Sequence, residues 1–304
     1  TCTTYEEILD KFLDYATVVR ELAPDAEITG PVTSSWYYYW NSAAGAQDKA
    51  AHDNQDFLPW FLDRVREHDE EKNVRTLDVL DIHYYPPGVY NEVVDDATSA
   101  LRLRSTRALW DPNYIVESDI AEPMYLIPLM KEVIERHYPG TKLGISEWNW
   151  GAEATMNGAL AIADVLGIFG REDIYFASYW VAPPLGSPGF NAFKMFTNYD
   201  GRGARFGDTS VWARSSDLDL VSGYSALDGE TGSMHLMLIN KQPASEASVN
   251  INLSNFEPQS RAMLYRYDEN SPEGIARQAV AGISPAFELT LPPYSITLLV
   301  LEPK

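Results

Sequence analysis

One stretch of the chain decides the fold: Lys142-Leu143-Gly144-Ile145-Ser146-Glu147-Trp148-Asn149-Trp150, an apolar segment that ends in a carboxylate among aromatic and polar side chains. It follows Pro139-Gly140 and precedes a helical pattern at about 154–169, which predicts a buried strand followed by a helix. The same alternation recurs along the first two thirds of the chain. The other predicted strands are 26–32, 77–85 and 174–181, and the other predicted helices are 5–22, 55–70, 95–106 and 124–137. Short strands that alternate with helices are typical of a parallel βα sheet.

The pattern changes after about residue 208, where short strands are separated by Gly, Pro, Asn and Asp turns. Leu227-Asp228-Gly229 marks one hairpin. The predicted strands are 218–227, 234–240, 247–253, 262–267, 287–291 and 295–301. This spacing predicts an all-β module, most simply a sandwich. We therefore expect two units, an α/β unit over 1–208 and a β-sandwich over 209–304.

Composition excludes several classes of partner. The chain has 304 residues with 45% hydrophobic and 22% charged residues, which is ordinary for a globular protein. Its net charge of −21 argues against nucleic acid and anionic membranes, because an acidic surface repels phosphate. No apolar run reaches the ~18–20 residues that cross a bilayer. The single cysteine, Cys2, excludes an internal disulfide and a cysteine-based metal site.

Each predicted parallel strand ends in polar or aromatic side chains. In βα barrels the chemistry sits at the carboxyl ends of the strands. The side chains found there are Trp36 and its aromatic neighbours, then His83, Tyr84 and Tyr85, then the Glu147 cluster, and finally Tyr179 and Trp180. Pyranose rings stack their C–H faces on aromatic rings, and their hydroxyls need polar partners. The strand ends therefore favour a sugar polymer as the ligand.

Glu147 is the candidate catalytic carboxylate. A glutamate near a strand end is usually solvated or ion-paired. Here it follows an apolar stretch, where an unused charge would be costly, and it is flanked by Trp148 and Trp150. We therefore interpret Glu147 as a catalytic residue.

The candidate substrate-binding residues surround this carboxylate in the predicted sheet: Trp36, Tyr37, His83, Tyr85, Trp148 and Trp180. His83 has no second histidine at metal-ligand spacing, so we favour a positioning role over a metal site. Tyr84 and Tyr85 alternate faces along the strand, and the sequence leaves open which one points into the site. Each tryptophan is either a sugar platform or part of the core.

Other motifs are weak. Gly201-Arg202-Gly203 follows no strand and does not continue to a dinucleotide-binding pattern. Ala121-Glu122-Pro123 lies just ahead of a helix, so we interpret it as a helix start. The Asp217–Asp219 loop lacks the spacing of a calcium loop. No cofactor or metal is expected, although the sequence leaves a structural calcium ion open.

Several of these stretches resemble glycoside hydrolase family 44. They are Tyr5-Glu6-Glu7-Ile8-Leu9, Ile28-Thr29-Gly30-Pro31-Val32, Asp81-Ile82-His83-Tyr84-Tyr85-Pro86, Ile145-Ser146-Glu147-Trp148-Asn149-Trp150-Gly151 and Leu291-Pro292-Pro293-Tyr294-Ser295-Ile296-Thr297. The resemblance implies a retaining endo-β-1,4-glucanase with a TIM-like barrel and an appended β-sandwich. The resemblance implies that Glu147 is the nucleophile on the seventh barrel strand. It also implies that the four predicted parallel strands are the fifth to eighth strands of the barrel.

One family feature is absent from the sequence. The acid/base glutamate of the family lies in an Asn-Glu-Pro motif, and this chain has no Asn-Glu-Pro. A retaining mechanism needs two carboxyl groups roughly 5–5.5 Å apart. We therefore expect an N-terminal half of the same enzyme to supply the acid/base and the other strands.

The resemblance also bears on substrate and location. We expect a secreted, extracellular enzyme whose partner is a β-glucan such as cellulose, xyloglucan or xylan. Two alternatives remain from the sequence: an exo-acting arabinosidase or xylosidase on a similar barrel, and a non-catalytic carbohydrate-binding protein.

Overall fold

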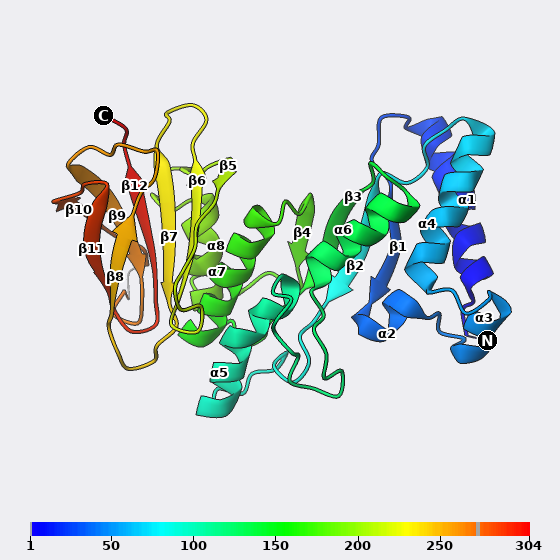
Figure 1. Cartoon of the computed structure of the whole chain (residues 1–304), viewed down its shortest axis with the longest axis horizontal. Coiled ribbons are helices and arrows are strands. Elements are labelled where there is room, and N and C mark those ends of the chain that lie inside the picture. Colours follow the sequence, from blue (N-terminus) through cyan, green and yellow to red (C-terminus); the bar gives the residue numbers. More distant parts are fainter. Residues whose placement is uncertain (1, 272–273) are drawn as a thin grey trace.

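A computed structural model of the chain describes residues 2–271 and 274–304. A four-stranded parallel sheet lies in one part of the molecule, and antiparallel sheets lie at the opposite end (Figure 1). The parallel strands pair in chain order: β1 (Thr29–Ser34), β2 (Val79–Tyr84), β3 (Lys142–Trp148) and β4 (Phe176–Tyr179). The predicted fold class, part of a βα barrel followed by a β-sandwich, is therefore confirmed.

Helices precede, separate and follow the parallel strands. They are α1 (Tyr5–Leu22), α2 (Ser35–Trp40), α3 (Ala46–Ala51), α4 (Phe57–Lys72), α5 (Asp96–Arg104), the 3-10 helix η1 (Ser105–Leu109), α6 (Leu126–His137), α7 (Met156–Arg171) and α8 (Pro188–Thr197). Helix α1 begins at a capping box, in which the Thr4 hydroxyl accepts the Glu7 N–H and the Glu7 carboxylate accepts the Thr4 N–H. The aromatic run after β1 forms α2, and α3 and α8 were not predicted.

The second part is built from antiparallel strands. They are β5 (Thr209–Val211), β6 (Val221–Leu227), β7 (Met234–Asn240), β8 (Ala247–Asn252), β9 (Arg261–Tyr267), β10 (Ala276–Ala281), β11 (Ala286–Leu291) and β12 (Ser295–Leu301). One sheet has the order β10-β9-β12-β7-β6-β5, and β11 pairs with β8 in the other. Strands β6 and β7 form the hairpin predicted at Leu227-Asp228-Gly229. Strands β5 and β10 are short or mostly exposed, so their hydrophobic pattern is weak.

The central strands β7 and β12 of the larger antiparallel sheet are buried on both faces. On β7, Leu236 and Leu238 pack into the apolar core between the two antiparallel sheets, whereas Met237 and Ile239 join the core that continues to the parallel sheet. This alternation follows from the two-residue period of a strand. The division at residue 208 stays a prediction, because the apolar core crosses the junction without a break.

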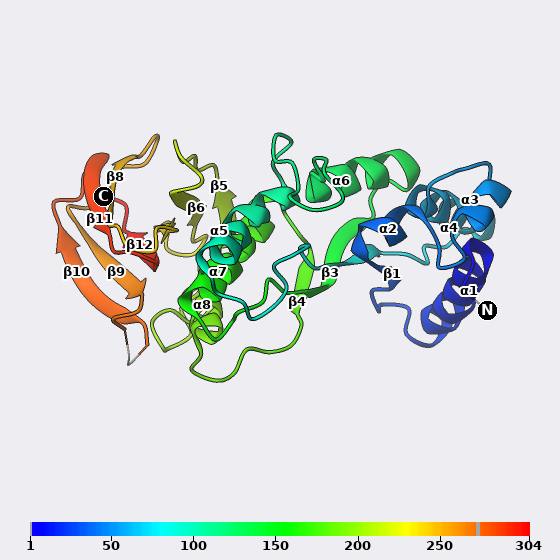
Figure 2. The same ribbon diagram turned by 90° about the horizontal axis from the view of Figure 1, so that it is seen from below.

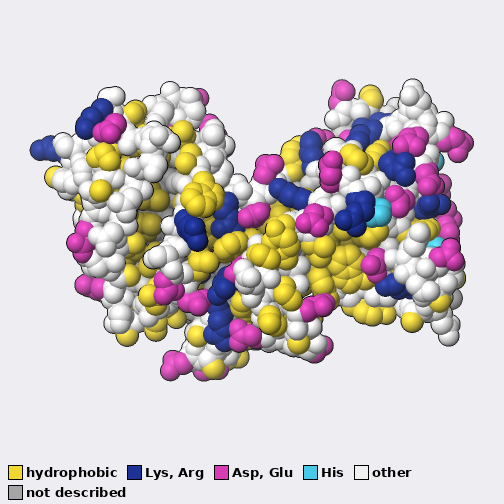
Figure 3. Space-filling view, viewed as in Figure 1, with side chains coloured by type: hydrophobic (Ala, Val, Ile, Leu, Met, Phe, Trp, Pro, Cys, Tyr) yellow, Lys and Arg dark blue, Asp and Glu magenta, His cyan; other side chains and the backbone are white. Residues whose placement is uncertain are grey.

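Helices α7 and α8 form the layer between the parallel sheet and the larger antiparallel sheet (Figures 1 and 2). Helix α7 is buried almost all round, as expected for a helix between two layers. Gly167 allows β6 to approach α7 closely, because a Cβ at this position would lie 2.3 Å from the Tyr224 ring. In the face seen in Figure 3, a notch separates the two parts above this junction. Among the residues described, no helix is both long and apolar enough to cross a bilayer.

A buried carboxylate on α7 ties the two parts together. Asp164 accepts hydrogen bonds from Thr106 Oγ1 at 2.6 Å, Tyr224 Oη at 2.7 Å and Lys241 Nζ at 2.9 Å. Burial alone would raise the pKa of Asp164, but Lys241 and the hydroxyl donors lower it overall. The carboxylate is therefore ionised and paired with a lysine that is itself buried.

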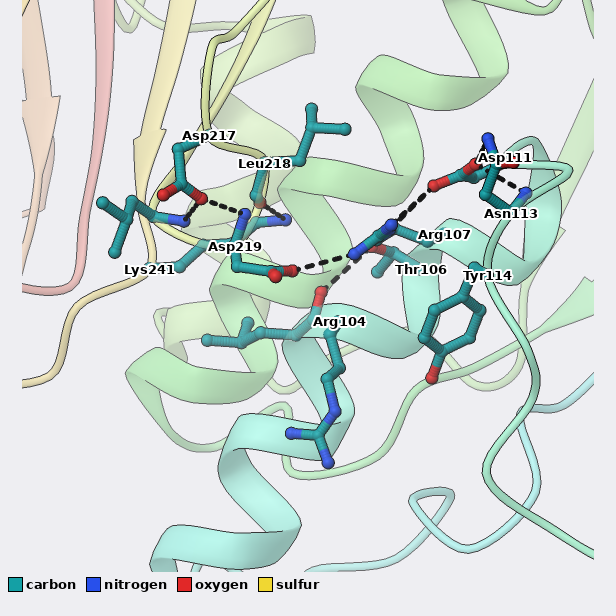
Figure 4. Close-up of polar contacts among 12 residues, drawn as sticks. Arg104, Thr106, Arg107, Asp111, Asn113, Tyr114, Asp217, Leu218, Asp219 and Lys241 are labelled. Atoms are coloured by element: carbon teal, nitrogen blue, oxygen red, sulfur yellow. Dashed lines mark hydrogen bonds and ion pairs between the residues drawn. The ribbon is translucent and has the colours of Figure 1, made fainter.

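A second link lies beside this pair at the junction. Arg107, on η1, lies between Asp111 and Asp219, as Figure 4 shows, with nitrogen–oxygen distances of 2.8 Å and 3.2 Å. Asp219 precedes β6, so the guanidinium connects the helical layer to the sandwich. Lys241 Nζ also donates to the Leu218 carbonyl at 3.3 Å.

We predict that Asp164→Ala lowers the free energy of unfolding of the complete protein by about 3–5 kcal/mol at pH 7, because it leaves the Lys241 ammonium buried without a partner. Since the folded-state pKa of Asp164 is depressed, its stabilisation is present above the unfolded pKa of about 3.9 and is lost as the pH falls through the folded value. Urea unfolding measures the change. The control is Glu257→Gln in an exposed ion pair with Lys304, which should leave the midpoint unchanged. Equal midpoints for the two variants would contradict the prediction.

Candidate active site

Glu147 lies near the carboxyl end of β3 with its side chain 28% exposed. Its Oε2 accepts a hydrogen bond from Tyr85 Oη at 2.8 Å and lies 3.1 Å from His83 Nδ1. Both partners come from β2 or directly follow it, so the parallel register brings them beside the carboxylate. The sequence-predicted residues Glu147, His83 and Tyr85 therefore form one cluster.

His83 is held on three sides. Its Nε2 lies 3.0 Å from Ser146 Oγ, and its backbone carbonyl accepts the hydroxyl of Tyr39 from α2. Its Nδ1 lies beside the Glu147 carboxylate, 3.1 Å from Oε2. The Ser146 hydroxyl can donate to Nε2 when that nitrogen carries no proton. This arrangement fits the predicted positioning role of His83.

The two tyrosines at the end of β2 separate, as their alternation requires. Tyr84 is buried against Trp150, whereas Tyr85 turns toward Glu147. Burial, followed by the hydrogen bond to Glu147 and its charge, raises the pKa of Tyr85 far above the usual tyrosine value. Tyr85 is therefore protonated at neutral pH and can donate its hydrogen bond to the carboxylate.

Trp148 is not a sugar platform, which corrects the sequence-based assignment. It is only 1% exposed, and its ring packs against Phe169, Tyr179 and Phe193. Because side chains alternate along a strand, Trp148 points into the layer of α7 and α8 while Glu147 points to the other side. Trp150 is also buried, and its Nε1 donates to Ser105 Oγ at 3.0 Å.

Trp180 directly follows β4 and is 49% exposed. Its backbone is fixed, because its N–H donates to the Trp148 carbonyl at 3.1 Å and its carbonyl accepts the Asn149 amide. Tyr179 Oη also donates to Asn149 Oδ1 at 2.9 Å. A rigid backbone with an exposed indole suits a stacking platform, and this role of Trp180 stays a prediction.

The remaining predicted residues lie on α2, directly after β1. Trp36 is half-buried and meets Tyr39 and Trp40 edge to face, so most of its ring serves the local packing. Tyr37 is exposed and meets Tyr38 at a right angle. Contact of Trp36 and Tyr37 with a substrate stays a prediction.

Sequence reasoning missed three residues that support the cluster: Tyr39, Asp81 and Ser146. Each of them makes a hydrogen bond to a backbone group or across to a neighbouring strand. The residue pattern does not predict such contacts. Tyr39 and His83 are far apart in the sequence, so only the structure shows that Tyr39 is a hydrogen-bond partner of His83. Among residues 2–271 and 274–304, no group of three or more His, Cys, Asp or Glu side chains is placed to hold a metal ion.

Parallel βα strands with a carboxylate at a strand end, followed by a β-sandwich, are the arrangement expected of a barrel-type glycoside hydrolase. Residues 1–88 match the model of glycoside hydrolase family 44. The resemblance to this family is therefore confirmed, and the chain carries a large part of the family's fold.

Individual relatives agree with this placement. The chain is 32% identical to a β-mannanase/endoglucanase A of Caldicellulosiruptor saccharolyticus, over 89% of this chain and 22% of that protein. It is 39% identical to CelM2, a bifunctional glucanase-xylanase from a metagenome library, with a TM-score of 0.95 over 99% of this chain and 60% of that one. A family 44 xyloglucanase of Paenibacillus polymyxa, solved with xyloglucan, is 30% identical with a TM-score of 0.91 over 99% of this chain and 62% of that one. The chain thus spans less than two thirds of the relatives it matches.

We predict that Tyr85→Phe lowers kcat of the complete enzyme by about 10–100-fold, with KM nearly unchanged. A hydrogen bond to a charged group contributes about 1.5–3 kcal/mol. Every ~1.36 kcal/mol added to the activation free energy lowers the rate tenfold. Steady-state kinetics on a soluble glucan measure the effect. Tyr90→Phe is the matched control, since the exposed Tyr90 ring packs on Tyr85 at 4.6 Å between centroids without contacting Glu147. Equal kcat values for Tyr85→Phe and wild type would show that the Tyr85 hydroxyl does not contribute to catalysis.

Proposed function

We propose that the complete enzyme hydrolyses internal β-1,4 bonds of glucans with retention of configuration, and that Glu147 is its nucleophile. The observation that carries this proposal is the Glu147 carboxylate at a strand end, with Tyr85 and His83 both on Oε2. The described contacts leave Oε1 as the oxygen that attacks the anomeric carbon. Attack forms a glycosyl-enzyme ester, which water then hydrolyses. The reaction uses no cofactor.

Tyr85 and His83 fix the orientation of the nucleophile. Tyr85 donates to Oε2 and His83 lies against the same oxygen, so rotation of the carboxylate is restricted and Oε1 meets the sugar from one direction. Such preorganisation costs nothing during the reaction, because the donors are already in place. The buried Trp148 packs against α7 and α8 and so fixes β3, the strand that carries Glu147.

The acid/base belongs, in this proposal, to a part of the enzyme outside this chain. Within the described residues, the hydrogen bonds and ion pairs of Glu147 involve no second carboxylate. The described parallel sheet has four strands, whereas about eight are needed to close a barrel around filled side chains. We therefore propose the N-terminal half of the same enzyme as the partner that completes the barrel and protonates the leaving oxygen.

The substrate class follows from the lining and from the charge. A net charge of −21 is indifferent to a neutral polysaccharide. Exposed aromatic rings at two different strand ends, Tyr37 after β1 and Trp180 after β4, suit several sugars of one chain rather than a single terminal sugar. Relatives described as a glucanase-xylanase and as a xyloglucanase support a backbone of β-1,4-linked sugars. A polymer of this kind is met outside the cell, so we propose an extracellular enzyme.

We predict that Glu147→Gln in the complete enzyme abolishes turnover by several orders of magnitude and leaves glucan binding nearly intact, because only the covalent route is lost. Reducing-sugar release from carboxymethylcellulose measures turnover, and this chain alone, without the acid/base, is the inactive control. A 2-deoxy-2-fluoro cellobioside should label the wild-type peptide that contains Glu147, as peptide mass spectrometry can show. A Glu147→Gln enzyme that keeps more than about a tenth of normal turnover would refute the assignment, as would labelling elsewhere.

We predict opposite outcomes for the exposed Trp180 and the buried Trp148. Trp180→Ala should weaken polysaccharide binding by about 5–150-fold, equivalent to roughly 1–3 kcal/mol for one lost stacking face, and leave the melting temperature unchanged. Trp148→Ala should instead destabilise the fold by about 3–5 kcal/mol, since it empties a buried site. Isothermal titration with a cello-oligosaccharide and thermal unfolding separate the two. A sharply lowered melting temperature for Trp180→Ala with unchanged affinity would show that Trp180 is core.

A further inference from the structure

Strand β3 contains one residue more than its neighbour β2 beside the nucleophile. Ile145 lies opposite Ile82, and Glu147 lies opposite His83, so Ser146 has no opposite residue in the register. An extra residue on one strand is a β-bulge, and bulges are over-represented next to active sites, where they re-aim a side chain.

The register against β4 shows the same irregularity. Ile145 lies opposite Ala177, and Trp148 lies opposite Tyr179, so three steps along β3 match two steps along β4. Because β3 is longer than both neighbours over the same span, the bulge belongs to β3 itself.

The bulge explains why two consecutive residues of β3 contact the same histidine ring. Consecutive residues of a regular strand point to opposite faces. Here Ser146 Oγ lies 3.0 Å from Nε2 of His83, and Glu147 Oε2 lies 3.1 Å from Nδ1 of the same ring. Both side chains are half-buried, while Ile145 and Trp148 on either side are fully buried. The two neighbours therefore reach one imidazole because the strand is bulged between them.

A buried carboxylate holds the extra residue. The N–H of Ser146 donates to Oδ1 of Asp81 at 3.0 Å, and Thr29 Oγ1 donates to Oδ2 at 3.2 Å. Asp81 lies on β2 and is only 2% exposed. A buried charge is costly unless it is hydrogen-bonded, and here its partners are a bulge amide on β3 and a hydroxyl on β1.

We propose that Asp81 is a positioning residue for the nucleophile: by accepting the Ser146 N–H it maintains the β-bulge that turns Glu147 toward His83 and Tyr85. The proposal rests on the proposed function, in which Glu147 attacks the sugar. Asp81 touches neither substrate nor the reacting atoms in this role. Loss of the Asp81 carboxylate would let β3 relax and would displace the attacking oxygen of Glu147 by about 1 Å.

The test measures kcat and KM separately in the complete enzyme. Asp81→Ala should lower kcat about 100-fold, the effect expected of a misplacement near 1 Å, and change KM less than about threefold because the sugar contacts remain. Asp81→Asn should keep kcat within about fivefold of wild type, because its amide oxygen can still accept the Ser146 N–H. The rate of labelling by the fluorinated cellobioside should fall in parallel with kcat.

Asp78→Ala is the matched control. Asp78 precedes the same strand, and its Oδ2 accepts the Ile28 N–H at 2.8 Å, but it lies at the amino end of the sheet. This variant should lose stability and keep its kcat. Should Asp81→Ala not fold, Asp81→Ser takes its place, since a hydroxyl on Cβ is too short to replace the carboxylate, and the same limits apply.

Three results would overturn the proposal: a kcat of Asp81→Ala within about threefold of wild type, an Asp81→Asn enzyme as impaired as Asp81→Ala, or an equal loss of kcat in Asp78→Ala. Glu147→Gln is assayed alongside. Residual turnover by that variant would refute the proposed function itself, whereas an inactive Glu147→Gln beside a normal Asp81→Ala refutes the positioning role alone.

Discussion

Burial of α7 on nearly all sides is the constraint on which the rest of the molecule depends. The helix lies between the parallel sheet and the larger antiparallel sheet, so both pack on one apolar element. Its one buried charge, Asp164, is paired with Lys241 from the far side of the junction. Because the two parts share this core, the sandwich is a support for the sheet rather than an appendage.

The active strand belongs to this core. Trp148 packs on Phe169 of α7 and Phe193 of α8, which fixes one side of β3. The other side of the strand presents Glu147 to Tyr85 and His83. A single strand thus connects the packed core to the carboxylate, and this would restrict the orientation of Glu147 in its proposed role.

Much of the fold could be predicted from local patterns. The four parallel strands, the longer helices between them and the hairpin at Leu227-Asp228-Gly229 follow from apolar runs and turn residues, which are local properties. Strand β10 was missed because most of its side chains are exposed and no apolar alternation marks it. Helix α8 was missed although Ser187 caps it and Pro188 begins it, because the apolar pattern there is short.

By itself, the sequence determined that Glu147 stands at the end of a buried strand and that aromatic side chains follow each strand end, because hydrophobic runs and their termini are written in residue order. Only the tertiary structure decided which of these side chains enter the site. Trp148 faces the core, Tyr85 and not Tyr84 faces Glu147, and Ser146 is an extra residue in its strand. The physical reason is register: the face to which a side chain points depends on pairing with β2 and β4, and a bulge of one residue reverses it.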